Sequence, residues 1–245
     1  MPGQLFNDAE RKRLGGYPPQ VPREDLVTFY TLTKADKAQV NRCTDDASRL
    51  GFALQLGSLR YLGFCPDDLA SAPPEVVGFL ADQLRVDPQA LSAYGQRAQT
   101  RTDHFLAVQA YLGFRKPDHE ERKRLARWLL DRTLEHDRPM LLWQLACEKL
   151  AADKVVRPGV TVLERLIVTA RGRAEHETMR RLAVVLDGTG RSLLDGLLIP
   201  DKATGQTPLS WLRRGEVANT PTAILAALER RATLVGWGVD RWDLG

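Results

Sequence analysis

The strongest constraint on the fold is a pair of closely spaced helix signals in residues 73–102. Apolar residues recur every three or four positions over residues 76–84, which is the period of a half-buried helix. A short turn then leads to Asp87 and Pro88, an N-cap residue followed by a proline at the first helical position. Two helices joined by so short a turn cross steeply. The stretch therefore predicts a helix-turn-helix whose second helix covers residues 88–97.

The second predicted helix and its extension carry side chains that suit DNA. Amide, hydroxyl and guanidinium groups are the ones that read base edges and bind phosphates in a major groove. Residues 88–102 contain two arginines and no carboxylate. The candidates for direct DNA contact are Gln89, Ser92, Gln96, Arg97, Thr100 and Arg101. An ordinary helical hairpin has the same spacing, so packing alone is the competing interpretation.

The rest of the chain has helical periodicity and no convincing run of β-strand alternation. A broad apolar face spans residues 50–62, Thr33 and Asp118 precede further helices as N-caps, and residues 140–150 are apolar nearly all round. Two separate helices are expected within residues 162–186. We therefore predict an all-α, multi-helical fold with helix-turn-helix-type DNA-binding subdomains.

The proline and glycine in residues 153–160 interrupt the helical pattern and suggest a boundary. We predict an N-terminal helical subdomain in residues 1–105, which contains the helix-turn-helix. A second helical subdomain is expected in residues 106–155. Residues 156–245 are expected to form a helical linker or third subdomain that leads toward a catalytic region absent from this chain.

Positive charge is concentrated in the later part of the chain. Residues 1–105 hold 12 basic and 13 acidic residues, whereas the remainder holds 23 and 18. The most basic helix is expected after Asp118, and the basic residues around its start are Arg115, Lys116, Arg122, Lys123 and Arg124. Such a cluster favours phosphate contacts without base information, although a solvated surface has the same pattern. Arg42, Arg49 and Arg60 are expected on the solvated side of their helix, with phosphate contacts as the alternative.

The sequence assembles no evident catalytic or metal site. The four histidines lack metal-ligand partners at helical or hairpin spacing, and the three cysteines are odd in number and far apart. The glycine-rich turn at residues 186–191 lacks the lysine and the serine or threonine of a P-loop. No apolar run has the length of a signal peptide or a membrane span. We expect a cytoplasmic protein with no membrane partner and no small-molecule ligand.

Several motifs occur in one order over most of the chain. They are RLGFALQL at residues 49–56, RYLG at 60–63, LADQL at 80–84 and LGFR at 112–115, with Tyr94, Thr102 and His104 between them. Together they resemble the N-terminal region of Tn-three (Tn3) family transposases, the enzymes of replicative, cointegrate-forming transposons. The resemblance begins near Leu5 and continues to the end of the sequence.

The resemblance implies that the chain binds double-stranded DNA at the terminal inverted repeats of a transposon, in association with the bacterial nucleoid. In that family an acidic triad holds magnesium in an RNase H-like domain further along the protein. That domain is absent here, so the resemblance implies no enzyme activity and no cofactor for this chain, and it leaves self-association open. The alternative is a helical protein-interaction or scaffold module without DNA binding. One departure is Arg85, where the family pattern leads us to expect glycine in the turn.

Overall fold

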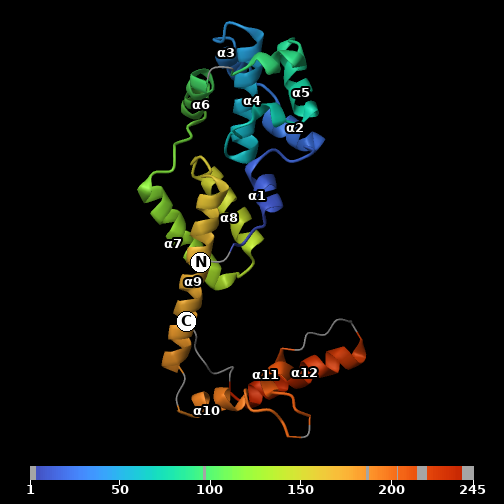
Figure 1. The fold of residues 1–245 in the computed structure, drawn as a ribbon, viewed down its shortest axis with the longest axis vertical. Coiled ribbons are helices and arrows are strands. Elements are labelled where there is room, and N and C mark those ends of the chain that lie inside the picture. The colour runs from blue at the N-terminus through green and yellow to red at the C-terminus, as the bar shows by residue number, and fades with distance from the viewer. Residues whose placement is uncertain (1–3, 96–97, 186–187, 203, 214–219, 239–245) are drawn as a thin grey trace. The chain divides into compact units, whose positions relative to one another are not determined.

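The structure is a computed structural model, and all of its named secondary-structure elements are helices (Figure 1). It describes residues 4–95, 98–185, 188–202, 204–213 and 220–238. Within these ranges, the β-type pairing is limited to an isolated bridge between Arg115 and Val155. The prediction of an all-α fold is therefore confirmed for the described part of the chain.

The chain divides into two compact units, Met1–Ala174 and Glu175–Gly245. The division falls inside one long helix, α9 (Val160–Val185). It does not coincide with the predicted boundaries after residues 105 and 155, which stay predictions about functional subdomains.

Helix α4 is the centre of the first hydrophobic cluster in the Met1–Ala174 unit. The elements up to residue 112 are α1 (Asp8–Gly15), α2 (Arg23–Tyr30), α3 (Lys34–Val40), α4 (Asp46–Leu62), the 3-10 helix η1 (Leu69–Ser71), α5 (Pro74–Leu84), the 3-10 helix η2 (Pro88–Ala93) and α6 (Ala98–Leu112). Residues 50–59 of α4 are all buried, because α2, α3, α5, η2 and α6 pack around this helix. The predicted apolar face is thus wider than expected and encircles the helix.

Side-chain caps set the starts of several helices. The Thr33 hydroxyl accepts a hydrogen bond from the N–H of Asp36, and the Asp36 carboxylate accepts one from the N–H of Thr33, which forms a capping box. The Asp118 carboxylate accepts from the N–H of Glu121 at the start of α7. Both predicted N-caps are confirmed, because this kind of signal depends only on neighbouring residues.

A second hydrophobic cluster forms where α7 (His119–Glu135), α8 (Pro139–Ala152) and the first part of α9 meet. Its fully buried members include Leu129 of α7, Leu142 of α8 and Ile167 of α9. The apolar stretch at residues 140–150 therefore serves as a core helix, as predicted.

The middle of the loop at residues 153–160 is buried in the core, because Val155, Val156 and Arg157 are each at most 9% exposed. Val155 belongs to the second cluster, whereas its neighbour Val156 belongs to the first. The N–H of Val156 donates to the carbonyl of Arg115 at 2.9 Å, and the N–H of Arg115 donates to the carbonyl of Lys154 at 2.9 Å. The loop therefore ties the two clusters together, despite the proline and glycine that suggested a boundary.

Arg157 lies in the same loop and is only 7% exposed. Its N–H donates to the carbonyl of Gly63 at 2.8 Å, and its guanidinium donates to the carbonyl of Leu14 at 2.7 Å. The guanidinium also lies 3.8 Å from the ring centroid of Phe64 and 5.2 Å from that of Trp143. Phe64 packs on the first cluster and Trp143 belongs to the second, so one cationic side chain contacts both.

The prediction of two separate helices within residues 162–186 is wrong, because α9 runs without interruption from Val160 to Val185. Gly172 does not break it, and the polar run that follows is bridged within the helix by Glu177, which accepts from Arg180 and Arg181. Beyond α9 lie α10 (Gly188–Gly196), α11 (Pro208–Leu212) and α12 (Pro221–Gly236). Among the described helices, none has the length and apolar character needed to cross a membrane.

Candidate nucleic-acid interface

The turn predicted between residues 84 and 88 is present. Arg85 adopts the left-handed conformation, with φ 57° and ψ 48°, and its N–H donates to the carbonyl of Asp82. A non-glycine residue in this region of φ and ψ is strained, which is the cost expected from the missing glycine. The Asp87 carboxylate then accepts from the N–H of Gln89 at 2.8 Å, as an N-cap should.

The element that follows is not the predicted α-helix of residues 88–97. It is η2, a six-residue 3-10 helix that ends at Ala93. Tyr94 has extended backbone angles, with φ −73° and ψ 135°, and Gly95 has a positive φ of 70°. The chain therefore leaves the helix before the residues that were expected to complete a recognition helix.

Tertiary packing of Tyr94 explains this early end. Its ring occupies the space above Gly51 of α4, where any added Cβ would overlap the ring. Its hydroxyl lies 2.9 Å from Nδ1 of His104 on α6, and the two rings are stacked with centroids 5.6 Å apart. Tyr94 therefore holds the end of η2 against α4 and α6. A continuous α-helix would place this side chain elsewhere.

Gln89 and Ser92 are exposed on η2. The Ser92 hydroxyl donates to the backbone carbonyl of Gln89 at 2.8 Å. Gln96 and Arg97 lie outside the described residues.

Thr100 and Arg101 lie in the first turn of α6, a different element from η2. The Arg101 guanidinium donates to the carbonyl of Asp67 at 3.1 Å, and its side chain runs beside Gly95. The described members of the predicted DNA-contact set are therefore divided between η2 and α6, and Arg101 is engaged by the fold.

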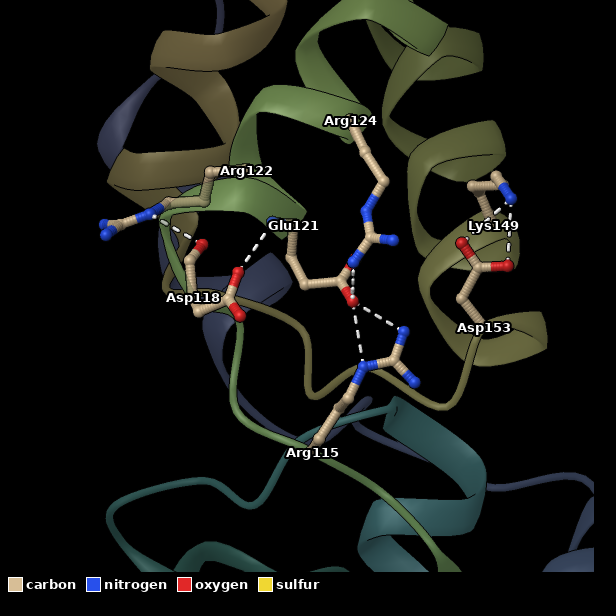
Figure 2. Close-up of polar contacts among 7 residues, drawn as sticks. All are labelled: Arg115, Asp118, Glu121, Arg122, Arg124, Lys149 and Asp153. Atoms are coloured by element: carbon tan, nitrogen blue, oxygen red, sulfur yellow. Dashed lines mark hydrogen bonds and ion pairs between the residues drawn. The ribbon is translucent and has the colours of Figure 1, made fainter.

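The basic cluster at the start of α7 is organised around one carboxylate (Figure 2). Glu121 is only 7% exposed, and its Oε1 accepts from Arg115 Nε at 2.8 Å and from Arg115 Nη2 at 2.6 Å. The same oxygen accepts from Arg124 Nη2. Glu121 is therefore an internal partner of Arg115 and Arg124, two of the five basic residues that were predicted to contact phosphate.

The other three members of this basic cluster differ in their partners. Arg122 Nε donates to the carbonyl of Asp118 at 3.3 Å, and Lys123 pairs with Glu120 at 2.9 Å. Lys116 is exposed and has no hydrogen-bond or ion-pair partner within the described part of the chain.

Arg60 is not on a solvated face as expected. Its guanidinium donates two hydrogen bonds, at 2.7 and 3.0 Å, to the fully buried carboxylate of Asp36. The Tyr111 hydroxyl donates to the same carboxylate at 2.9 Å. Burial alone would raise the pKa of Asp36, but the hydrogen bonds from Arg60, Thr33 and Tyr111 lower that pKa to about 2.

Sequence reasoning missed a groove between α7 and α9, which lie side by side in Figure 1. It has a volume of about 530 Å³. Its lining residues are His119, Arg122, Lys123, Ala126 and Arg127 from α7, and Val162, Arg165, Leu166, Thr169 and Arg173 from α9. The signal available in the sequence was the spacing of Arg165, Thr169 and Arg173, which places them on one helix face.

Similarity to known proteins places the chain among transposase sequences. It is 31% identical over 234 residues to the transposase for transposon Tn501 of Pseudomonas aeruginosa, covering 95% of this chain and 24% of that protein. It is 31% identical to the transposase for transposon gamma-delta of Escherichia coli, covering 94% and 23%. It is 27% identical to the transposase for transposon Tn1546 of Enterococcus faecium, covering 90% and 23%.

Residues 5–170 match the family described as "Domain of unknown function (DUF4158)", and the chain belongs to this family. The resemblance to Tn3-family transposases is confirmed. The chain spans about a quarter of the length of the curated relatives it matches.

Proposed function

We propose that this chain is the DNA-binding part of a Tn3-family transposase and that it recognises the terminal inverted repeats of a transposon. The observation that carries the proposal is the similarity to transposases over 95% of the chain. The exposed Gln89 and the exposed arginines of α7 supply the amide and guanidinium groups that DNA recognition needs.

Base reading is assigned to the residues predicted around η2, among which Gln89 is exposed. A glutamine amide can form a bidentate pair with adenine, worth about 1–3 kcal/mol of discrimination against another base. Phosphate contacts are assigned to the cluster at the start of α7, with Lys116 and Arg122 available directly. Arg115 and Arg124 contribute less, because Glu121 already accepts their hydrogen bonds.

The chain is proposed to bind transposon ends without cutting or joining them. In the family that it resembles, an acidic triad elsewhere in the protein performs strand transfer. The purified chain should therefore leave an end-containing duplex intact during incubation with magnesium. Site-specific nicking of that duplex would contradict this part of the proposal.

The test is a pair of titrations at several salt concentrations, one with an inverted-repeat duplex and one with a random duplex. Tighter binding to the inverted repeat and a steep loss of affinity with salt are expected. Gln89→Ala should weaken binding to the inverted repeat by about 1–3 kcal/mol and leave the random duplex nearly unchanged.

Gln144→Ala is the matched control, because Gln144 is an exposed glutamine on α8. It should change neither titration, and circular dichroism should show both variants folded. Absence of binding to either duplex at low salt would overturn the proposal in favour of a protein-interaction module. Equal losses on both duplexes for Gln89→Ala would show that bases are read elsewhere.

A further inference from the structure

The α7–α9 groove combines dense positive charge with an apolar floor. Its cations are Arg122, Lys123 and Arg127 on α7, and Arg165 and Arg173 on α9. Lys123 and Arg127 are four residues apart on α7, and Arg165 and Arg173 are eight residues apart on α9, so the members of each pair lie on one face of their helix. Ala126, Val162 and Leu166 supply the apolar lining, and no carboxylate lines the groove.

Three of these arginines have no hydrogen-bond or ion-pair partner among the residues that the structure describes. Arg127, Arg165 and Arg173 are exposed, and none forms a side-chain hydrogen bond or ion pair with a residue in the described ranges. Like charges that converge without a counter-charge repel each other, and a bound anion relieves that repulsion. The groove is therefore suited to an anionic ligand from outside the chain.

The span of the charges favours a polyanion. Arg165 and Arg173 are eight residues apart on a continuous helix, which corresponds to about 12 Å along its axis. A DNA strand carries one negative charge for about every 3.4 Å of duplex axis, so such a span exceeds a single phosphate. Guanidinium groups also match phosphate oxygens with two parallel hydrogen bonds.

We infer that the α7–α9 groove binds the sugar-phosphate backbone of one strand of a DNA duplex, through Arg127, Arg165 and Arg173. Apart from the imidazole of His119, no aromatic ring lines the groove, whereas proteins that bind single strands stack successive bases on several aromatic rings. No asparagine or glutamine lines it either, so it lacks the amides that pair with adenine. The groove positions DNA and does not choose its sequence.

This inference rests on the proposed DNA binding and adds a contact surface distinct from η2. The experiment compares the whole chain with a variant carrying Arg127→Gln, Arg165→Gln and Arg173→Gln, on inverted-repeat and random duplexes over a range of salt. Affinity should fall by the same factor on both duplexes. The slope of log affinity against log salt should become shallower by about 3, because each lost phosphate contact removes about one unit.

The matched control carries Arg23→Gln, Lys34→Gln and Lys37→Gln, three exposed cations on α2 and α3. It makes the same change in net charge and should leave the salt slope nearly as it is in the parent chain. A third variant with lysine at the three groove positions keeps the charge and should restore most of the slope. Circular dichroism checks folding, and single Arg→Gln changes, each worth about one unit of slope, serve if the triple variant is unstable.

The outcomes separate the two proposals. If the parent chain binds DNA and the groove variant keeps its salt slope, the groove assignment is wrong while the proposed function stands. A selective loss on the inverted repeat, or a loss confined to single-stranded oligonucleotides, would also overturn the assignment. If the parent chain binds no DNA at low salt, the proposed function itself fails.

Discussion

Arginines around α4 and arginines in the α7–α9 groove have the same chemistry but different partners. Arg60 donates to the buried Asp36 carboxylate and Arg101 donates to a backbone carbonyl, so both help to hold the first hydrophobic cluster together. Arg127 and Arg165 make no such bond to any described residue. The comparison teaches that availability for DNA depends on which oxygen atoms the fold brings near a cation, and not on local basic sequence.

The largest effect is expected from Arg60→Ala. This change leaves the Asp36 carboxylate buried without its main cation, and removal of one partner from a buried ion pair costs about 3–5 kcal/mol. Urea unfolding followed by circular dichroism measures the loss. DNA affinity should be unchanged under conditions where the variant is folded, and weaker DNA binding at unaltered stability would instead indicate that Arg60 contacts phosphate.

Gly51→Ala should have the next largest effect. The added methyl group would displace the Tyr94 ring, which holds η2 against α4, and overpacking of this kind costs about 1–3 kcal/mol. Gly78→Ala on α5 is the matched control, because a Cβ there meets open space. The control should raise the unfolding free energy by up to about 1 kcal/mol, since alanine favours a helix over glycine. Equal effects of the two substitutions would show that Tyr94 does not fasten η2.

The smallest effect is expected from Glu121→Gln, which removes the internal partner of two arginines instead of removing an arginine. Loss of the carboxylate releases Arg115 and Arg124 for phosphate contacts, so affinity should rise by roughly two- to tenfold on specific and random duplexes alike. Glu24→Gln makes the same charge change on the exposed surface of α2 and should raise affinity less. An unchanged affinity in Glu121→Gln would mean that these arginines do not face DNA.

Local signals in the sequence predicted the helix starts well. Thr33, Asp87 and Asp118 each cap a helix where expected, because a cap involves residues only two or three positions apart. The same signals do not determine where a helix ends. At η2 the contact between Tyr94 and Gly51, 43 positions away in sequence, decides the end.

The candidate site was less predictable than the fold because its contacts also join residues that are far apart in sequence. Arg60 is 24 positions from Asp36, and the local sequence around either residue does not predict their pairing. Arg165 and Arg173 share one face only because α9 is continuous. The sequence pattern predicted two helices within residues 162–186 and therefore did not indicate this face. Arg115 and Arg124 were predicted to contact phosphate because basic residues cluster there in the sequence. The buried Glu121 carboxylate forms ion pairs with both.

The position of Arg157 bears on how the Met1–Ala174 unit comes apart. Opening either hydrophobic cluster alone would remove the contact of the Arg157 guanidinium with Phe64 or with Trp143. It would also break the hydrogen bond from the Arg157 backbone N–H to Gly63 or the bond from the guanidinium to Leu14. We therefore expect forms with one cluster intact and the other melted to be poorly populated, so that the unit unfolds cooperatively. Hydrogen exchange should then give the same opening free energy for the backbone amides of α4 and of α8, equal to that of global unfolding.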